Sequence, residues 1–183
     1  MSIIIVGNSK GLLGRGLGKV INSYSVICRF NNYRVEGFEE DVGSKLGWWV
    51  VRSCDDIKLQ PKNSFEKLFV VQPRCRYFSA MVPVAHRYKL LYGDKFNLIG
   101  PEECSEAHRA LDLGDFNKEW ISVGMAFLWH VLSSYGSVSV VGMDQGNTHY
   151  WNHPPKDSCY HNYAKEKVMF DNWVKEGRIN LLY

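Results

Sequence analysis

The sequence predicts an α/β fold, built as a single domain around a mostly parallel central sheet. Short apolar runs rich in β-branched residues recur along the chain, and such runs are typical of strands buried on both faces. Segments in which apolar residues keep helical spacing lie between several of these runs. The chain also opens as strand, glycine-rich turn, short helix and strand, which is how an α/β nucleotide-binding unit begins.

The apolar runs give the expected strands, and the periodic segments give the expected helices. Strands are predicted over residues 3–6, 25–30, 48–52, 67–71, 96–99, 138–141 and 179–183. Helices are predicted near residues 17–21 and over residues 102–111, 122–136 and 163–175, with Ser122 as the N-cap of the third. Residues 74–92 are aromatic, basic and interrupted by Pro83, and they fit either a plain helix with a loop or the wall of a binding groove.

Size and composition fit one globular domain over residues 1–183. The net charge of +3 is too small to indicate a nucleic-acid partner. No early apolar run approaches the roughly 20 residues that cross a bilayer, so no transmembrane segment and no signal peptide are expected. The five cysteines form no CxxC pair and are odd in number, which argues against a zinc site and a disulfide framework and favours a reduced, cytoplasmic chain.

The glycines after the first strand do not complete either of the common phosphate-binding loops. The dinucleotide pattern G-x-G-x-x-G fails because Ile21 stands at its last position. The P-loop pattern fails because Leu13 and Val20 stand where it needs a glycine and a hydroxyl residue. The first two strands instead end on Asn8 and Asn31, whose amides can pair with a base, a ribose or a phosphate. These residues alone leave both a nucleotide site and plain turn chemistry open.

Four stretches stand out by the order of their residues. The first comprises VGNS at residues 6–9, RFN at 29–31 and VEGFEEDVGSK at 35–45. The second is SVG at 122–124 with Gly142 after the next strand, the third is GNTHYWN at 146–152, and the fourth is the pair His161 and Glu166. In this order they resemble the large, small, third and very small sialyl motifs of the sialyltransferases of glycosyltransferase family 29. The resemblance covers nearly the whole chain and is weakest over residues 53–115.

The resemblance implies a Rossmann-like, GT-A-variant fold and a glycosyl transfer reaction. The enzyme would be metal-independent and inverting, and would move sialic acid, or a related ulosonic acid such as Kdo, from a CMP-sugar to a hydroxyl of a glycan or glycolipid. His161 would be the catalytic base, and His149 would hydrogen-bond the departing phosphate. The residues implied for CMP-donor binding are Asn8, Ser9, Asn31, Ser122, Gly124 and Gly142, and those implied for support are Glu166, Tyr150 and Trp120. Glu166 would support the local fold or orient the ring of His161.

The residue types are compatible with such chemistry without a cofactor. Many glycosyltransferases hold a metal with an Asp-x-Asp pair, and no such pair occurs here. A donor with one phosphate, such as CMP-sialic acid or CMP-Kdo, needs less charge compensation than a diphosphate. Histidine is a natural base because its unperturbed pKa lies near 6.5, within the physiological range. His149, His153 and His161 together also leave a zinc site open as an alternative.

Two departures from the family pattern and two rival functions remain. The family's membrane anchor and its disulfide between the large and small motifs have no counterpart, because Met1 and Ser2 precede the first strand and Ser133 and Ser134 occupy the small motif. This favours a cytoplasmic chain of microbial or viral origin.

The rivals are a CMP-binding protein that has lost transfer activity and a nucleotide-dependent reductase. Without the family, His161 and Glu166 would read as an ion pair at a helix start.

Overall fold

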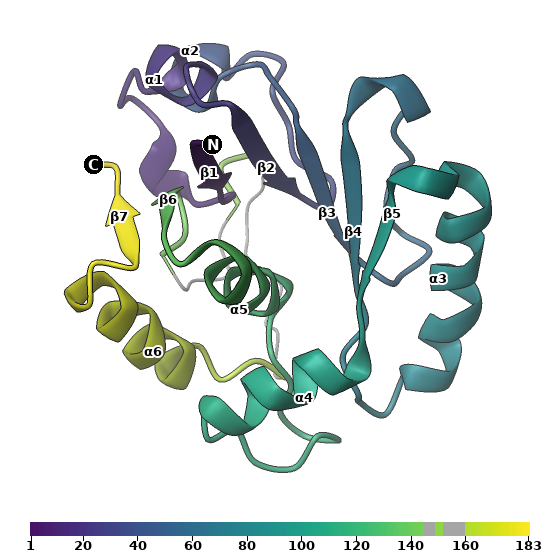
Figure 1. Cartoon of the computed structure of the whole chain (residues 1–183). Helices are drawn as coiled ribbons and strands as arrows, with labels where there is room; N and C mark the ends of the chain where they lie inside the picture. The colour runs from purple at the N-terminus through teal and green to yellow at the C-terminus, as the bar shows by residue number, and fades with distance from the viewer. Residues whose placement is uncertain (145–148, 152–159) are drawn as a thin grey trace.

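The computed structural model of the chain describes residues 1–144, 149–151 and 160–183. These residues form one seven-stranded sheet in which every neighbouring pair of strands is parallel (Figure 1). The strands are β1 (Ile3–Val6), β2 (Val26–Phe30), β3 (Trp48–Arg52), β4 (Lys67–Val71), β5 (Phe96–Ile99), β6 (Val138–Val141) and β7 (Ile179–Leu181). Their order across the sheet is β5-β4-β3-β2-β1-β6-β7. The predicted fold class is confirmed.

Helices cover both faces of the sheet (Figure 1). They are α1 (Gly18–Asn22), α2 (Glu39–Val42), α3 (Phe78–Tyr92), α4 (Pro101–Ala110), α5 (Val123–Tyr135) and α6 (Tyr163–Lys175). Ile3 and Ile5 of β1 pack in one core cluster with α4, α5 and α6, whereas Ile4 and Val6 pack in another with α1 and α2. Successive strand residues point to opposite faces, so covering both faces requires the continuous apolar runs seen in the sequence.

Helix α3 resolves the segment that the sequence left open. It runs through Pro83, although a proline inside a helix removes one hydrogen bond and costs roughly 3 kcal/mol. Val84, Tyr88 and Tyr92 of α3 are buried in one core cluster with Trp49 of β3. Burying a single large apolar side chain stabilises by roughly 1.5–3 kcal/mol, so this packing outweighs the proline.

Several predicted bounds differ from the structure by one or two residues. The acidic residues 39–41 form one helical turn, α2, whose exposed residues include Glu39 and Glu40. The last strand ends at Leu181, two residues earlier than predicted. Within the described part of the chain, no helix is long and apolar enough to cross a membrane. The cysteines that the structure describes, Cys28, Cys54, Cys75 and Cys104, are free thiols.

The sheet topology indicates the edge at which a ligand would bind. From β1 the chain adds strands in one direction as far as β5, and then returns to place β6 on the other side of β1. In open α/β sheets, ligands bind beyond the carboxyl ends of the strands where the order reverses in this way. Here that position lies beyond Val6 of β1 and Val141 of β6.

Candidate active site at the carboxyl edge of the sheet

The ends of β1 and β6 approach each other through two glycines. Gly7 donates its N–H to the carbonyl of Val141 at 2.8 Å, and Ser9 donates its N–H to the carbonyl of Gly142 at 3.0 Å. A Cβ on Gly7 would lie 2.0 Å from the oxygen of Gly142. Gly142 itself has φ +67°, and a Cβ there would lie 2.5 Å from Leu12. A side chain at Gly7 would therefore push the two strand ends apart, and one at Gly142 would displace Leu12.

Predicted donor residues border this junction. Ser9 is buried, and its hydroxyl donates to the carboxylate of Asp144 and accepts from the N–H of Gly11. The carbonyl of Asn8 accepts from the N–H of Tyr150 at 2.9 Å. The end of β1 is thus bonded both to the segment after β6 and to the third motif, which lies far away in sequence.

Asn31 occupies the corresponding position at the end of β2. Its φ of 49° lies in the left-handed region, which asparagine tolerates better than most residues. Its side-chain Oδ1 accepts from the backbone N–H of Arg52 at 3.0 Å, and its carbonyl accepts from the indole N–H of Trp49 at 3.0 Å. These bonds hold Oδ1 against β3 and leave the Nδ2 group as the part that can donate to a ligand.

Arg29 in the large motif has a structural place that the sequence did not reveal. Its guanidinium is buried and donates to the carbonyls of Val42 at 2.6 Å and Lys45 at 2.8 Å. Burial lowers its pKa below the ordinary value, although the cation also lies over the ring of Tyr33. The Arg29 side chain thereby fastens residues 42–45 to β2, which explains why this stretch of the large motif can hold its shape.

The small and very small motifs meet at the start of α5. Ser122 is the N-cap of α5, and its hydroxyl accepts from the N–H of Met125 at 3.2 Å. The carboxylate of Glu166, fully buried in α6, accepts from the N–H and from the hydroxyl of Ser122, both at 2.7 Å. Burial raises the pKa of Glu166 to about 7 against the opposing effect of these two hydrogen bonds. Glu166 therefore supports the local fold through Ser122, and not through an ion pair with His161.

His161 is oriented by a backbone carbonyl. Its Nδ1 lies 2.8 Å from the oxygen of Trp120, and a carbonyl can only accept, so Nδ1 carries the proton. In the neutral ring this leaves the lone pair on Nε2. Burial lowers the pKa of His161, the bond to Trp120 raises it in part, and the charge of Arg52 lowers it further.

Of the third motif, the structure describes His149, Tyr150 and Trp151. The ring of His149 stacks on Trp151 at a centroid distance of 5.0 Å. Its pKa lies below the ordinary value, first because of desolvation and then because of the charge of Arg52, with Asp144 acting in the opposite sense. The hydroxyl of Tyr150 donates to the carbonyl of Arg34. Residues 146–148 and 152 of this motif lie outside the described residues.

Arg52, which no sequence pattern indicated, acts electrostatically on both His149 and His161. It closes β3 at the carboxyl edge, its N–H holds Asn31, and its guanidinium pairs with Asp56 while remaining partly exposed. Its positive charge lowers the pKa of His149 and of His161 alike. No motif marked Arg52, because its electrostatic effect on the two histidines depends on how three separate segments converge.

Most of the predicted residues thus gather into two groups, while Asn31 lies against β3. Asn8, Ser9, Gly142 and Tyr150 surround the β1–β6 junction, and Trp120, Ser122, His161 and Glu166 surround the start of α5. Gly124 connects the groups, since a Cβ there would lie 2.8 Å from the Cε of Met143. Trp120, predicted as a supporting residue, stacks on Tyr160 at a centroid distance of 4.5 Å. The functional roles of all these residues stay predictions.

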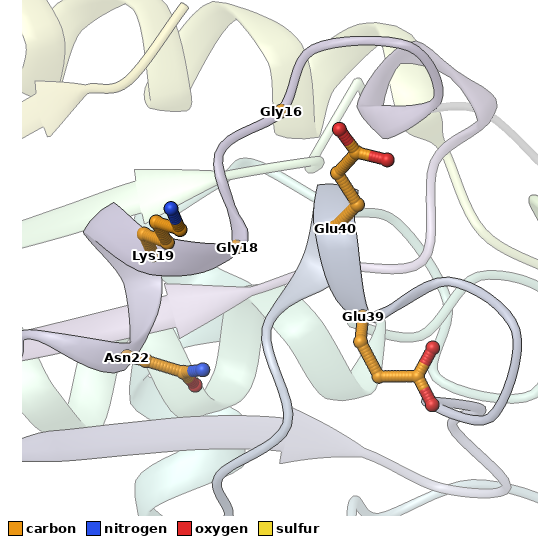
Figure 2. A pocket seen from close by; sticks show the side chains of 6 residues that line it. All are labelled: Gly16, Gly18, Lys19, Asn22, Glu39 and Glu40. Atoms are coloured by element: carbon orange, nitrogen blue, oxygen red, sulfur yellow. The ribbon is translucent and has the colours of Figure 1, made fainter.

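A cavity of about 490 Å³ lies elsewhere, between α1 and α2 (Figure 2). The residues that line it are Gly16, Gly18, Lys19, Asn22, Glu39 and Glu40. None of the predicted donor or catalytic residues contributes to it. Gly18 is needed for the close packing of the two short helices, because a Cβ there would lie 2.0 Å from the carbonyl oxygen of Glu39.

The residues that the structure describes contain no cluster of three or more histidine, cysteine or acidic side chains that could hold a metal ion. The zinc alternative requires His153, which lies outside the described residues. Both the zinc alternative and the expectation of a metal-free site therefore remain predictions.

Comparisons with known proteins confirm the resemblance to the sialyltransferases. The sequence model of glycosyltransferase family 29 (sialyltransferase) matches residues 2–72. The rat CMP-N-acetylneuraminate-beta-galactosamide-alpha-2,3-sialyltransferase 4 is 52% identical over 42 residues, which are 23% of this chain and 13% of the rat protein. The human CMP-N-acetylneuraminate-beta-1,4-galactoside alpha-2,3-sialyltransferase is 50% identical over 42 residues, 23% of this chain and 11% of that protein.

The fold likeness extends much further than the sequence identity. The crystal structure of a mammalian sialyltransferase superposes on 99% of this chain and 68% of its own, with a TM-score of 0.76 and 19% sequence identity. A structure of a mammalian sialyltransferase in complex with Gal-beta-1-3GalNAc-ortho-nitrophenol gives a TM-score of 0.75, with the same coverage and identity. The α/β fold of this chain is therefore the sialyltransferase fold.

Proposed function

We propose that this chain is a sialyltransferase of glycosyltransferase family 29 that moves sialic acid from CMP-sialic acid to a hydroxyl of a glycan acceptor. The observation that carries the proposal is the geometry of His161. Its Nδ1 donates to the carbonyl of Trp120 at 2.8 Å, which leaves the lone pair on Nε2. Its lowered pKa keeps the ring neutral near pH 7, as a general base requires.

The leaving group would be stabilised by groups along the carboxyl edge of the sheet. His149 would donate a hydrogen bond to the phosphate of the departing CMP, and the positive charge of Arg52 would offset part of the negative charge that develops there. We propose that these groups act in place of a metal ion. A base on the acceptor side and a leaving phosphate on the other side suit a single direct displacement, which would invert the configuration at the transferred carbon.

The donor would lie along the carboxyl edge of the sheet. Asn8 and Asn31 would bind it with their side-chain amides, and Gly142 would allow its close approach to the backbone. Ser122 would contribute mainly by fixing the start of α5, since its N–H and hydroxyl are already bonded to Glu166. The proposed sugar is sialic acid or a related ulosonic acid such as Kdo.

The proposed acceptor is a galactose-containing glycan. The names of the curated relatives combine alpha-2,3-sialyltransferase with beta-galactosamide or beta-1,4-galactoside, and one structural relative holds Gal-beta-1-3GalNAc-ortho-nitrophenol. The matched segment is a small part of those relatives, so their linkage and acceptor are extended to this chain as part of the proposal.

Two measurements test the proposal. The first is titration of CMP, with UMP and GDP as controls, into the wild type and Asn8→Ala; selective CMP binding that the variant weakens is expected. The second is CMP release from CMP-sialic acid with Gal-beta-1-3GalNAc as acceptor, with and without EDTA. Because a general base contributes about 10²–10⁴-fold, His161→Gln should lose that factor. His86→Gln, an exposed histidine of α3, is the matched control and should retain activity.

The outcomes separate the proposal from its rivals. CMP binding without release in the presence of acceptors would favour a CMP-binding protein that lacks transfer activity. Absence of CMP binding would rule out the sialyltransferase proposal. Loss of activity with EDTA would refute metal independence and leave the donor assignment intact.

A further inference from the structure

Two chain segments are joined side by side next to the proposed base. The N–H of Trp120 donates to the carbonyl of Tyr160 at 3.0 Å, and the carbonyl of Trp120 accepts from Nδ1 of His161 at 2.8 Å. Trp120 thus bonds through both of its backbone groups to the segment that leads into α6. The orientation of the His161 ring depends on how firmly the carbonyl of Trp120 is held.

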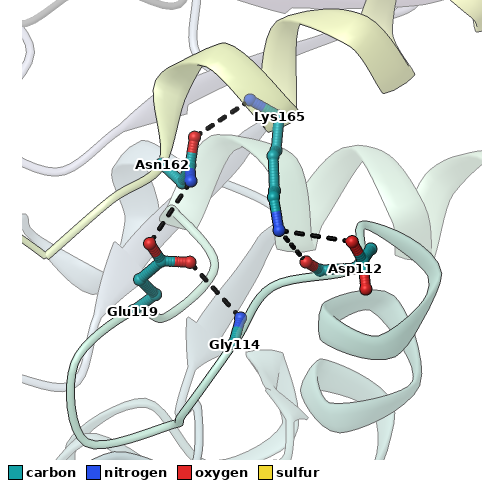
Figure 3. Close-up of polar contacts among 5 residues, drawn as sticks. All are labelled: Asp112, Gly114, Glu119, Asn162 and Lys165. Carbon is teal, nitrogen blue, oxygen red and sulfur yellow. Dashed lines mark hydrogen bonds and ion pairs between the residues drawn. The ribbon is translucent and has the colours of Figure 1, made fainter.

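The residues next in sequence to this pair also bond to each other (Figure 3). Asn162 donates from Nδ2 to Oε1 of Glu119 at 3.3 Å, while its Oδ1 accepts from the N–H of Lys165 at 3.1 Å and caps α6. Glu119 accepts from the N–H of Gly114 with its other oxygen, at 3.3 Å. Glu119 precedes Trp120 and Asn162 follows His161, so this bond adds to the two bonds of Trp120 that connect the same two segments.

The Glu119 side of this connection is held firmly. His108, which is 2% exposed, stacks on Phe116 at 4.0 Å and donates from Nε2 to the carbonyl of Glu119 at 2.9 Å. Lys165 donates to the carbonyl and the carboxylate of Asp112 at the other end of the loop. The loop that carries Trp120 is therefore attached to α4 and to α6. The bond between Glu119 and Asn162 lies where this loop meets the segment that carries His161.

We propose that Glu119 and Asn162 are positioning residues for His161: their side-chain bond holds the carbonyl of Trp120 against Nδ1 and so selects the tautomer with the lone pair on Nε2. Either ring nitrogen of a neutral histidine can carry the proton, and the hydrogen bond that one nitrogen makes decides which. The effect on the ring needs no catalytic role for His161. The effect on turnover rests on the proposed function.

The test uses a substitution that removes the bond and keeps the helix cap. Asn162→Asp retains an oxygen for the N–H of Lys165, but it loses the Nδ2 donor and sets a carboxylate against that of Glu119. Adding Glu119→Gln to the same chain restores a donor, with its direction reversed. Asn172→Asp makes the same chemical change at an exposed site of α6 and is the matched control.

Two readouts are needed. Nitrogen-15 NMR of the imidazole rings reports the tautomer of His161, with the signals assigned by comparison with His161→Gln. Steady-state kinetics with CMP-sialic acid report kcat and the donor KM. For Asn162→Asp we expect a mixture of tautomers, a fall in kcat of about tenfold (about 1.4 kcal/mol in the barrier) and a donor KM within about twofold. The double variant should recover both readouts, and the control should change neither.

Other results overturn the inference. An unchanged tautomer in Asn162→Asp refutes it, and so does a fall in kcat that the double variant does not reverse. If Asn162→Asp fails to fold, Glu119→Ala removes the same bond without touching the cap of α6 and must give the same change of tautomer. A wild type that shows the Nδ1-protonated ring but no transfer activity would sink the proposed function and leave the positioning of the ring established.

Discussion

Glu166 allows a sharp test of how the site is held together, because its carboxyl is fully buried and its pKa is raised to about 7. The ordinary value is 4.5, and each unit of difference between the folded and unfolded states is worth about 1.4 kcal/mol. Since the folded-state pKa is the higher one, the contribution of the protonated carboxyl to stability is full below about pH 4.5. It is lost as the pH rises through about 7.

The free energy of unfolding should therefore fall between pH 5 and pH 8 by about 2–3 kcal/mol on account of this one group. Glu166→Gln keeps the shape, an acceptor for the N–H of Ser122 and a donor for its hydroxyl, and it does not ionise. The variant should match the wild type at pH 5 and exceed it at pH 8, as measured by urea denaturation at each pH. Glu176→Gln, exposed just beyond α6, is the control and should follow the wild type.

The reasoning fails if the stabilities of the wild type and Glu166→Gln run parallel across this pH range. Such a result would mean that the carboxyl titrates near its ordinary value in the folded protein. It would follow that water reaches Glu166 and that the two bonds from Ser122 stabilise the carboxylate enough to offset burial.

Two further predictions concern the carboxyl edge. Gly7→Ala should lower the stability measured by thermal unfolding by about 1–3 kcal/mol, because its Cβ would lie 2.0 Å from the oxygen of Gly142. Gly11→Ala is the control, since its Cβ meets only an ordinary contact of 3.4 Å and its stability should change little. Similar losses of stability in both variants would contradict the steric account. Arg52→Gln removes a positive charge and should raise the pKa of His149 and His161, so the acid limb of the rate profile should move to higher pH. A limb that stays in place would show that Arg52 does not act on them.

The sequence predicted the sheet well because its signal is local. Strands buried on both faces need runs of apolar residues, and the runs at Ile3–Val6 and Trp48–Arg52 have the bounds of the strands observed. The helix Phe78–Tyr92 could not be assigned, because Pro83 argued against it locally. What stabilises that helix is burial of Tyr88 and Tyr92 with Trp49, which depends on contacts between distant segments.

In the candidate site, too, residue identity could be predicted from the sequence, whereas contacts between distant segments could not. The motifs identified His161, Ser122 and Glu166 as residues of interest, and the structure brings them together. The sequence left two roles for Glu166, support of the fold or orientation of the histidine ring, and only coordinates could show that it bonds to Ser122. The partner that does orient the ring is a main-chain carbonyl, that of Trp120, and a carbonyl leaves no trace in residue identity.

Arg52 shows how the parts of the proposed site would act on one another. In the free protein burial lowers the pKa of His161 and the charge of Arg52 lowers it further, but a lower pKa also makes a weaker base. A CMP-sugar brings negative charge to the same edge of the sheet and would offset the charge of Arg52. The pKa of His161 would then rise while Trp120 still holds Nδ1. His161 would thus be a stronger base when the donor is bound, and a weaker base when the site is empty.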